Sequence, residues 1–189
     1  YKKEFWKHMS NLEKRILTSI IIFPLSIFFI FQGGKILLLF LLAIFFVANY
    51  ELFSVFNKKI TILFLDLILI LSLFSIYYLR DAGIYSFNIL LWVILLCVMS
   101  DIGGYVFGRI FKWKKFTKIS PKKTVSGLLG SFLFSLIWLV FASKFFDLVV
   151  LDFKYFLLTL IFSMVAQAGD LTISYFKRKE KIKDTGKIL

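Results

Sequence analysis

Two acidic residues each follow directly after a long apolar run. Asp101 follows the run Ile84–Ser100, and Asp170 follows the run Tyr155–Gly169. Carboxylate oxygens suit Mg²⁺, and an ion held by one or two of them keeps positions free for water and phosphate. Each carboxylate could instead pair with a nearby lysine at the membrane interface, and the residues alone favour neither interpretation.

A second polar group lies in the basic segment between the fourth and fifth apolar runs. Ser120, Lys122, Lys123 and Thr124 surround Pro121, which stops regular helix. Two ammonium groups and a hydroxyl in such a turn suit the oxygens of a phosphate group. The alternative is that the lysines only set membrane topology and hold anionic lipid headgroups, and charge alone favours this alternative.

A third polar group follows the last apolar run. If the helix there continues to about Arg178, then Gln167, Asp170, Ser174 and Lys177 share one of its faces. A polar stripe on an otherwise apolar helix is expected to face protein or water rather than lipid. The stripe would bring Asp170 to the same depth as Asp101.

The elements that must position these residues are membrane-spanning helices. Hydrophobic residues make up 60% of the 189-residue chain and charged residues 19%, whereas about a quarter of a soluble domain is charged. A crossing helix needs about 20 mostly apolar residues. The sequence predicts an all-α, polytopic bundle with about six spans: Ile16–Phe31, Ile36–Phe56, Ile60–Leu79, Ile84–Ser100, Leu128–Ser143 and Tyr155–Gly169.

The distribution of basic residues predicts the orientation. With the amino terminus in the cytoplasm, the cytoplasmic segments hold 20 of the 24 lysines and arginines. All three polar groups then lie at the cytoplasmic face, in a membrane that we expect to be the bacterial inner membrane. The single histidine and single cysteine exclude a metal site built from those residues, so any metal is expected on oxygen.

Glycines mark two places where the backbone is expected to turn or to approach another helix. Gly33 and Gly34 predict a tight turn with residues free to adopt positive φ. Gly104 and Gly108 have the four-residue spacing that lets two helix backbones approach closely.

Three stretches of the second half of the chain carry a family resemblance. They are Asp101 to Arg109 with its glycines, Ser120 to Gly127, and Gly169-Asp170-Leu171 followed by Ser174, Lys177-Arg178, Lys183-Asp184 and Gly186. In this order and spacing the chain resembles the phosphatidate cytidylyltransferases, also called CDP-diacylglycerol synthases. The resemblance implies one transmembrane cytidylyltransferase domain over residues 1–189.

The resemblance also implies the reaction and its participants. A phosphate oxygen of phosphatidate would attack the α-phosphorus of CTP and release pyrophosphate, for phospholipid biosynthesis. The expected cofactor is Mg²⁺, with a second monovalent or divalent cation as an option. Membrane lipid is expected as a partner, with a homodimer as an option, and nucleic acid is not expected.

The resemblance assigns roles residue by residue. Those implied are catalysis by Asp170, Lys177 and Asp101, substrate binding by Ser120, Lys122, Lys123, Thr124, Ser174, Arg178, Lys183 and Asp184, and a metal ion on Asp170. The family signature continues beyond the point where this chain has Leu189, so we expect the sequence to be truncated at its carboxyl terminus, and also at its amino terminus. Two other functions stay open: a CTP-dependent polyprenol or phytol-type lipid kinase, and a non-catalytic lipid-binding or transport protein.

Overall fold

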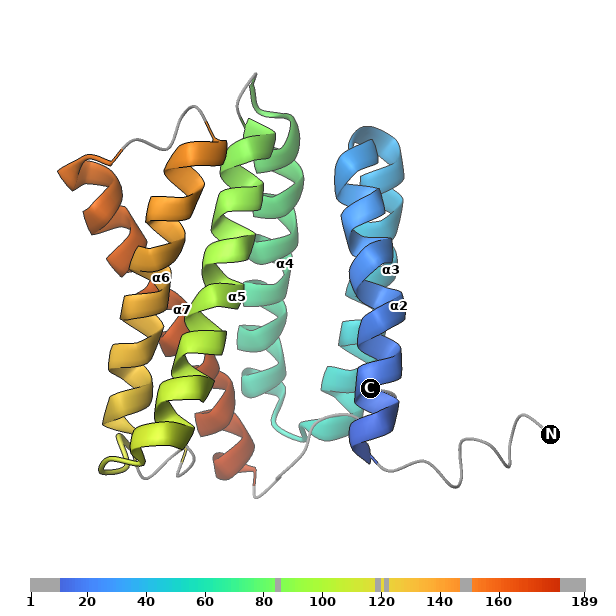
Figure 1. The fold of residues 1–189 in the computed structure, drawn as a ribbon. Helices are drawn as coiled ribbons and strands as arrows, with labels where there is room; N and C mark the ends of the chain where they lie inside the picture. The colour runs from blue at the N-terminus through green and yellow to red at the C-terminus, as the bar shows by residue number, and fades with distance from the viewer. Residues whose placement is uncertain (1–10, 84–85, 118–119, 121–122, 147–150, 181–189) are drawn as a thin grey trace. The chain divides into compact units, whose positions relative to one another are not determined.

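The computed structural model describes residues 11–83, 86–117, 120, 123–146 and 151–180, without the side chains of 11–19 and 21. In this part of the chain every regular element is a helix, which confirms the predicted all-α fold (Figure 1). The helices form two compact units. The first ends at Asp81 and contains α2, α3 and α4, and the second, Ala82–Lys183, contains α5, α6 and α7.

Five helices in the described part are long and apolar enough to cross a membrane. They are α3 (Gly34–Val55), α4 (Lys59–Asp81), α5 (Ser86–Phe111), α6 (Val125–Phe145) and α7 (Phe153–Lys179). Large apolar side chains on them are exposed, Ile60 by 85% and Leu63 by 74%, which is unfavourable in water and expected in lipid. The chain is therefore an integral membrane protein. The predicted first span lies in α2 (Asn11–Gln32), whose apolar stretch with described side chains is Ile22–Gln32.

The first unit turns tightly between α2 and α3. Gly33 and Gly34 have φ of 65° and 52°, as predicted for a turn that requires glycine. At the far end of α3, the backbone N–H of Phe56 donates to the carbonyl of Leu52 and ends the helix. The Phe56 side chain is buried before α4 begins at Lys59.

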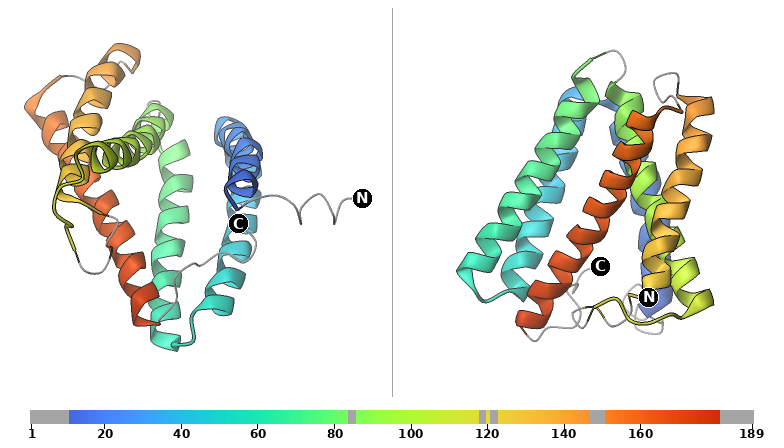
Figure 2. Two further views of the ribbon diagram at one scale, coloured as in Figure 1. Left: turned by 60° about the horizontal axis from the view of Figure 1, so that its bottom comes forward. Right: turned by 90° about the vertical axis from the view of Figure 1, so that its left-hand side faces the viewer.

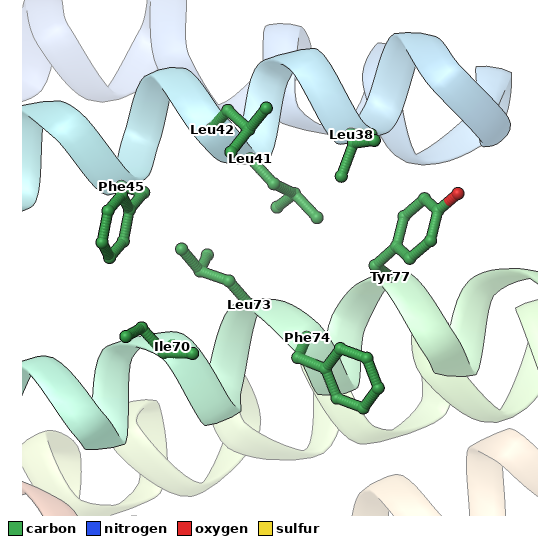
Figure 3. Close-up of a pocket in the computed structure, with 8 residues that line it drawn as sticks. All are labelled: Leu38, Leu41, Leu42, Phe45, Ile70, Leu73, Phe74 and Tyr77. Atoms are coloured by element: carbon green, nitrogen blue, oxygen red, sulfur yellow. The ribbon is translucent and has the colours of Figure 1, made fainter.

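A groove of about 230 Å³ lies between α3 and α4 (Figure 3). Its walls are apolar except for the Tyr77 hydroxyl, and are formed by Leu38, Leu41, Leu42 and Phe45 of α3 with Ile70, Leu73, Phe74 and Tyr77 of α4. Two spans can pack with such a gap between them because acyl chains are as apolar as the side chains they replace.

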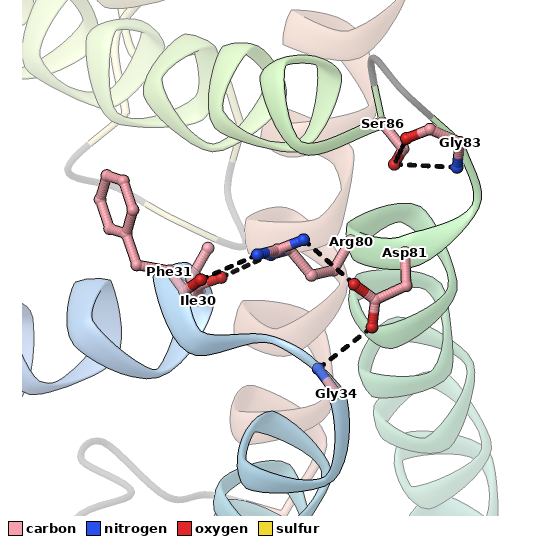
Figure 4. Close-up of polar contacts among 7 residues, drawn as sticks. All are labelled: Ile30, Phe31, Gly34, Arg80, Asp81, Gly83 and Ser86. Atoms are coloured by element: carbon pink, nitrogen blue, oxygen red, sulfur yellow. Dashed lines mark hydrogen bonds and ion pairs between the residues drawn. The ribbon is translucent and has the colours of Figure 1, made fainter.

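Arg80, at the end of α4, holds the turn between α2 and α3 (Figure 4). Its guanidinium donates to the carbonyls of Ile30 at 2.6 Å and Phe31 at 2.8 Å, which belong to the last turn of α2. Asp81 pairs with Arg80 at 3.0 Å and accepts from the backbone N–H of Gly34 at 3.1 Å. The pair thus satisfies groups that helix ends leave without an internal partner.

The second unit begins with a short turn in which Ser86 bonds to both backbone groups of Gly83 (Figure 4). From there α5 and α6 run side by side, and α7 packs against both (Figure 2). In the first half of α5, Trp92 and Leu96 form a buried cluster with Leu139 and Ala142 of α6.

Towards the other end, α5 and α6 cross through glycines. A Cβ on Gly103 would clash with the carbonyl oxygen of Gly130 and lie 2.6 Å from Cβ of Phe134. The predicted close approach at Gly104 and Gly108 is confirmed as well, since both glycines lie against Gly127 of α6. This crossing brings the end of α5 beside the start of α6.

Candidate active site

A cavity of about 540 Å³ opens in the second unit where α5 ends, α6 begins and α7 passes both. These three parts lie at the lower end of the unit in Figure 1. Acidic, basic and hydroxyl side chains line it together with small and apolar ones: Asp101, Gly104, Tyr105, Phe116, Ser120, Lys123, Thr124, Gly127, Leu128, Ala166, Gln167, Asp170, Leu171 and Ser174. Such a mixture suits a ligand that carries both charge and apolar groups.

The segment between α5 and α6 folds back on itself and presents Lys123 to the cavity. The N–H of Phe116 donates to the carbonyl of Lys123 at 2.8 Å, and the N–H of Val125 donates to the carbonyl of Lys114 at 3.0 Å. The N–H of Lys123 itself donates to the carbonyl of Ser120 at 3.0 Å. The backbone around Lys123 is therefore fixed by its own hydrogen bonds.

Thr124 begins α6 as its amino-terminal cap. Its hydroxyl accepts from the N–H of Gly127 at 3.1 Å and contacts the Ser126 hydroxyl at 3.0 Å. The start of a helix carries partial positive charge, and here it lines the cavity. Thr124 thus contributes to an anion-binding environment through the helix that it starts.

Lys123 and Asp170 form an ion pair inside this cavity. The Lys123 ammonium lies 2.7 Å from the Asp170 carboxylate and 2.9 Å from Oε1 of Gln167. The Lys123 side chain is 21% exposed, whereas that of Asp170 is 61% exposed. Asp170 is therefore consistent with both interpretations that the sequence left open, because it pairs with a lysine and also lines an open cavity.

Two carboxylates are available to a metal ion in this cavity. Asp101 and Asp170 both line it, and the Asp101 carboxylate interacts electrostatically with Asp170 and Lys123. No group of three or more His, Cys, Asp or Glu side chains is arranged as a metal site among the residues described. Mg²⁺ is commonly held by one or two carboxylates plus substrate phosphates, so this pair fits such an ion.

Six of the predicted site residues line the cavity together: Asp101, Ser120, Lys123, Thr124, Asp170 and Ser174. Lys177 and Arg178 lie in the last turn of α7, beyond the residues that line it. The predicted residues Lys122, Lys183 and Asp184 lie outside the part of the chain that the structure describes. The expected continuation of the last helix to about Arg178 is confirmed, since α7 ends at Lys179.

Gln167 and Ser131 are site residues that the predicted set lacks. Gln167 holds Lys123, and Ser131 of α6 accepts a hydrogen bond from Nε2 of Gln167 at 3.0 Å. Sequence spacing did place Gln167 on the polar face of its helix with Asp170. Nothing in the spacing indicates the partners of Gln167, because Lys123 belongs to the segment between α5 and α6 and Ser131 belongs to α6.

The amino-acid sequence of this chain matches that of known proteins. Residues 57–189 match the model of the cytidylyltransferase family. The chain belongs to this family, as its motifs predict.

Named relatives agree with this assignment. The chain is 37% identical over 113 residues to a phosphatidate cytidylyltransferase of Staphylococcus saprophyticus, covering 59% of this chain and 44% of that protein. It is 29% identical over 202 residues to the phosphatidate cytidylyltransferase of Rickettsia felis, covering 100% of this chain and 86% of that protein. The chain thus covers less than half of the staphylococcal relative's length. No solved structure matches it.

Proposed function

We propose that the protein transfers a cytidylyl group from CTP to phosphatidate, giving CDP-diacylglycerol and pyrophosphate. The observation that carries the proposal is the cavity that gathers Asp101, Lys123 and Asp170 at the end of membrane helices in a member of the cytidylyltransferase family. Relatives that bear the name phosphatidate cytidylyltransferase support the choice of substrates.

The reaction exchanges one phosphoanhydride bond for another. A phosphate oxygen of phosphatidate forms a bond to the α-phosphorus of CTP, while the bond from that phosphorus to the bridging oxygen of the β-phosphate breaks. The bonding electrons leave with pyrophosphate. Because both reactants are anions, the protein has to hold them together against repulsion and balance the charge of the transferring group.

Residues of the cavity suit these tasks. Lys123 and the start of α6 place positive charge towards the triphosphate, and Ser120 and Ser174 offer hydroxyls to phosphate oxygens. Asp101 and Asp170 would hold Mg²⁺, which supplies Lewis-acid stabilisation of phosphate oxygens when bound. From the family motif we assign pyrophosphate or lipid-phosphate binding to Lys177, Arg178 and Lys183, and triphosphate binding to Lys122. Asp184 is assigned to substrate binding by the same motif.

We also propose that the cavity opens to the cytoplasm, in the inner membrane of a bacterium. CTP is a cytoplasmic solute, whereas the phosphate of phosphatidate lies at the membrane interface. A site at the cytoplasmic ends of spanning helices gives both substrates access. The excess of lysine and arginine in the segments on that side supports this orientation.

The first test is conversion of α-³²P-labelled CTP into lipid-extractable product by membranes that carry the full-length gene product, with phosphatidate and Mg²⁺. We expect labelled CDP-diacylglycerol, and a loss of turnover of at least about 100-fold in Asp170→Asn, because a neutral amide is a poor metal ligand. Transfer of the γ-label of CTP to a polyprenol, with no α-label in lipid, would instead identify a lipid kinase. Unchanged turnover in Asp170→Asn would contradict the metal assignment.

A further inference from the structure

One uncharged side chain, that of Gln167, joins α7 to two other parts of the cavity wall. The amide of Gln167 accepts from the Lys123 ammonium through Oε1 at 2.9 Å and donates through Nε2 to the Ser131 hydroxyl at 3.0 Å. The backbone carbonyl of Gln167 accepts from the same ammonium at 3.4 Å. Gln167 therefore connects α7 to the loop that carries Lys123 and to α6.

The direction of the amide is fixed by these partners. Ser131 is fully buried, and its hydroxyl donates to the carbonyl of Gly127 at 3.2 Å, so it meets Gln167 as an acceptor. An acceptor at that point requires the NH₂ end of the amide, which leaves the oxygen for Lys123. Gly104 makes room for this arrangement, since a Cβ there would lie 2.7 Å from the Ser131 oxygen.

The Lys123 ammonium has three acceptors, and only one of them belongs to Asp170. An ammonium has three hydrogens, and here its partners are the Asp170 carboxylate and two oxygens of Gln167. A largely buried ammonium is costly to leave without acceptors. If Gln167 were absent, Asp170 would be the principal acceptor for Lys123. With Gln167 in place, Lys123 retains partners when Asp170 turns to another ligand.

We infer that Gln167 is a positioning residue that keeps the Lys123 ammonium directed into the cavity for a phosphate group when Asp170 leaves the ion pair for another ligand. The assignment of Lys123 to phosphate rests on the proposed function. The coupling between Gln167 and Lys123 rests on the geometry alone.

The test is a double-mutant cycle read by ligand binding rather than by turnover. The variants are Gln167→Leu, Lys123→Met and their combination, in the purified full-length protein, and the probes are CTP and inorganic pyrophosphate with Mg²⁺, measured by calorimetry. We expect Gln167→Leu to raise the Kd for both probes about 10-fold, the usual size of a lost hydrogen bond to a charged group. In the Lys123→Met background the same change should have no further effect, because Gln167 acts through Lys123.

A matched control removes a polar side chain from the same helix without touching the cavity. The Thr172 hydroxyl donates to the carbonyl of Ala168 on its own helix at 2.8 Å, so Thr172→Val should leave both Kd values unchanged. If Gln167→Leu fails to fold, Ser131→Ala releases the other end of the amide, and its effect on Kd should also vanish in the Lys123→Met background.

The outcomes separate this inference from the proposed function. Independent, additive effects of Gln167→Leu and Lys123→Met, an unchanged Kd in Gln167→Leu, or wild-type protein that binds neither probe would each overturn the inference. Pyrophosphate binding that shows the coupling, in a protein that makes no labelled CDP-lipid, would uphold the inference and overturn the proposed substrates. Turnover to CDP-diacylglycerol with unchanged Kd in Gln167→Leu would uphold the proposed substrates and overturn the inference about Gln167.

Discussion

At the scale of single residues, the cavity is balanced between opposite charges rather than dominated by one. Lys123 contacts Asp170 at 2.7 Å, and Asp101 lines the same space. A nucleotide with Mg²⁺ brings both signs of charge, so it can replace each internal interaction with one of its own. The two carboxylates are not equivalent, because only Asp170 is paired with Lys123.

Because Asp101 is the carboxylate that is not paired with Lys123, we expect Asp101→Asn to weaken Mg²⁺ binding in particular. Removing the carboxylate that has no ion-pair partner among the described side chains should raise the Mg²⁺ concentration for half-maximal activity by at least about tenfold, as weakened ligand sets do. This concentration is measured by titrating activity with Mg²⁺ at saturating CTP.

The control for Asp101→Asn is the same change at the opposite end of the second unit. Asp152 caps α7 by accepting from the N–H of Phe153 at 2.6 Å, and asparagine caps helices equally well. Asp152→Asn should therefore leave the Mg²⁺ dependence as it is. An equal shift in both variants, or none in Asp101→Asn, would remove Asp101 from the metal site.

At the scale of helices, apolar run length predicts the elements well and their ends poorly. Each predicted span lies within or largely overlaps a helix, yet α5 continues from the predicted end at Ser100 to Phe111. The extension contains Asp101, Arg109 and three glycines, and these glycines pack on α6. Spacing indicated Gly104 and Gly108, whereas the tightest contact joins Gly103 to Gly130, because a crossing angle is not encoded in one helix alone.

The α5–α6 crossing predicts that Gly103→Ala destabilises the protein. The new Cβ would meet a backbone carbonyl of α6, which cannot move aside like a side chain, so an overpacking cost of about 1–3 kcal/mol is expected. Thermal unfolding in detergent should show a lower midpoint. Because the crossing positions Asp101 against the start of α6, activity should fall before unfolding begins.

Gly169→Ala is the matched control, since nothing lies within 4 Å of its added Cβ. In a helix this change favours folding by up to about 1 kcal/mol. Equal midpoints for Gly103→Ala and Gly169→Ala would mean that the α5–α6 contact is looser than described.

At the scale of the whole molecule, the site depends on which side of the membrane each connection occupies. The cavity is built from the segment between α5 and α6 and from the end of α7, two regions that hold much of the chain's positive charge. The sequence predicts this grouping because helices alternate direction across a bilayer. It could not predict that Lys123, Gln167 and Ser131 would contact one another, since that depends on how the loop folds back at Phe116.

Orientation is testable because the chain has a single cysteine, Cys97, inside α5. In a Cys97→Ala background, Lys154→Cys and Lys144→Cys should react with a membrane-impermeant maleimide added to spheroplasts, whereas Lys58→Cys and Lys114→Cys should react only after permeabilisation. All four lysines are exposed, so access depends on the side of the membrane and not on burial. The expected pattern follows from the retention of lysine and arginine on the cytoplasmic side. The opposite pattern would place the cavity away from cytoplasmic CTP and would contradict the proposed reaction.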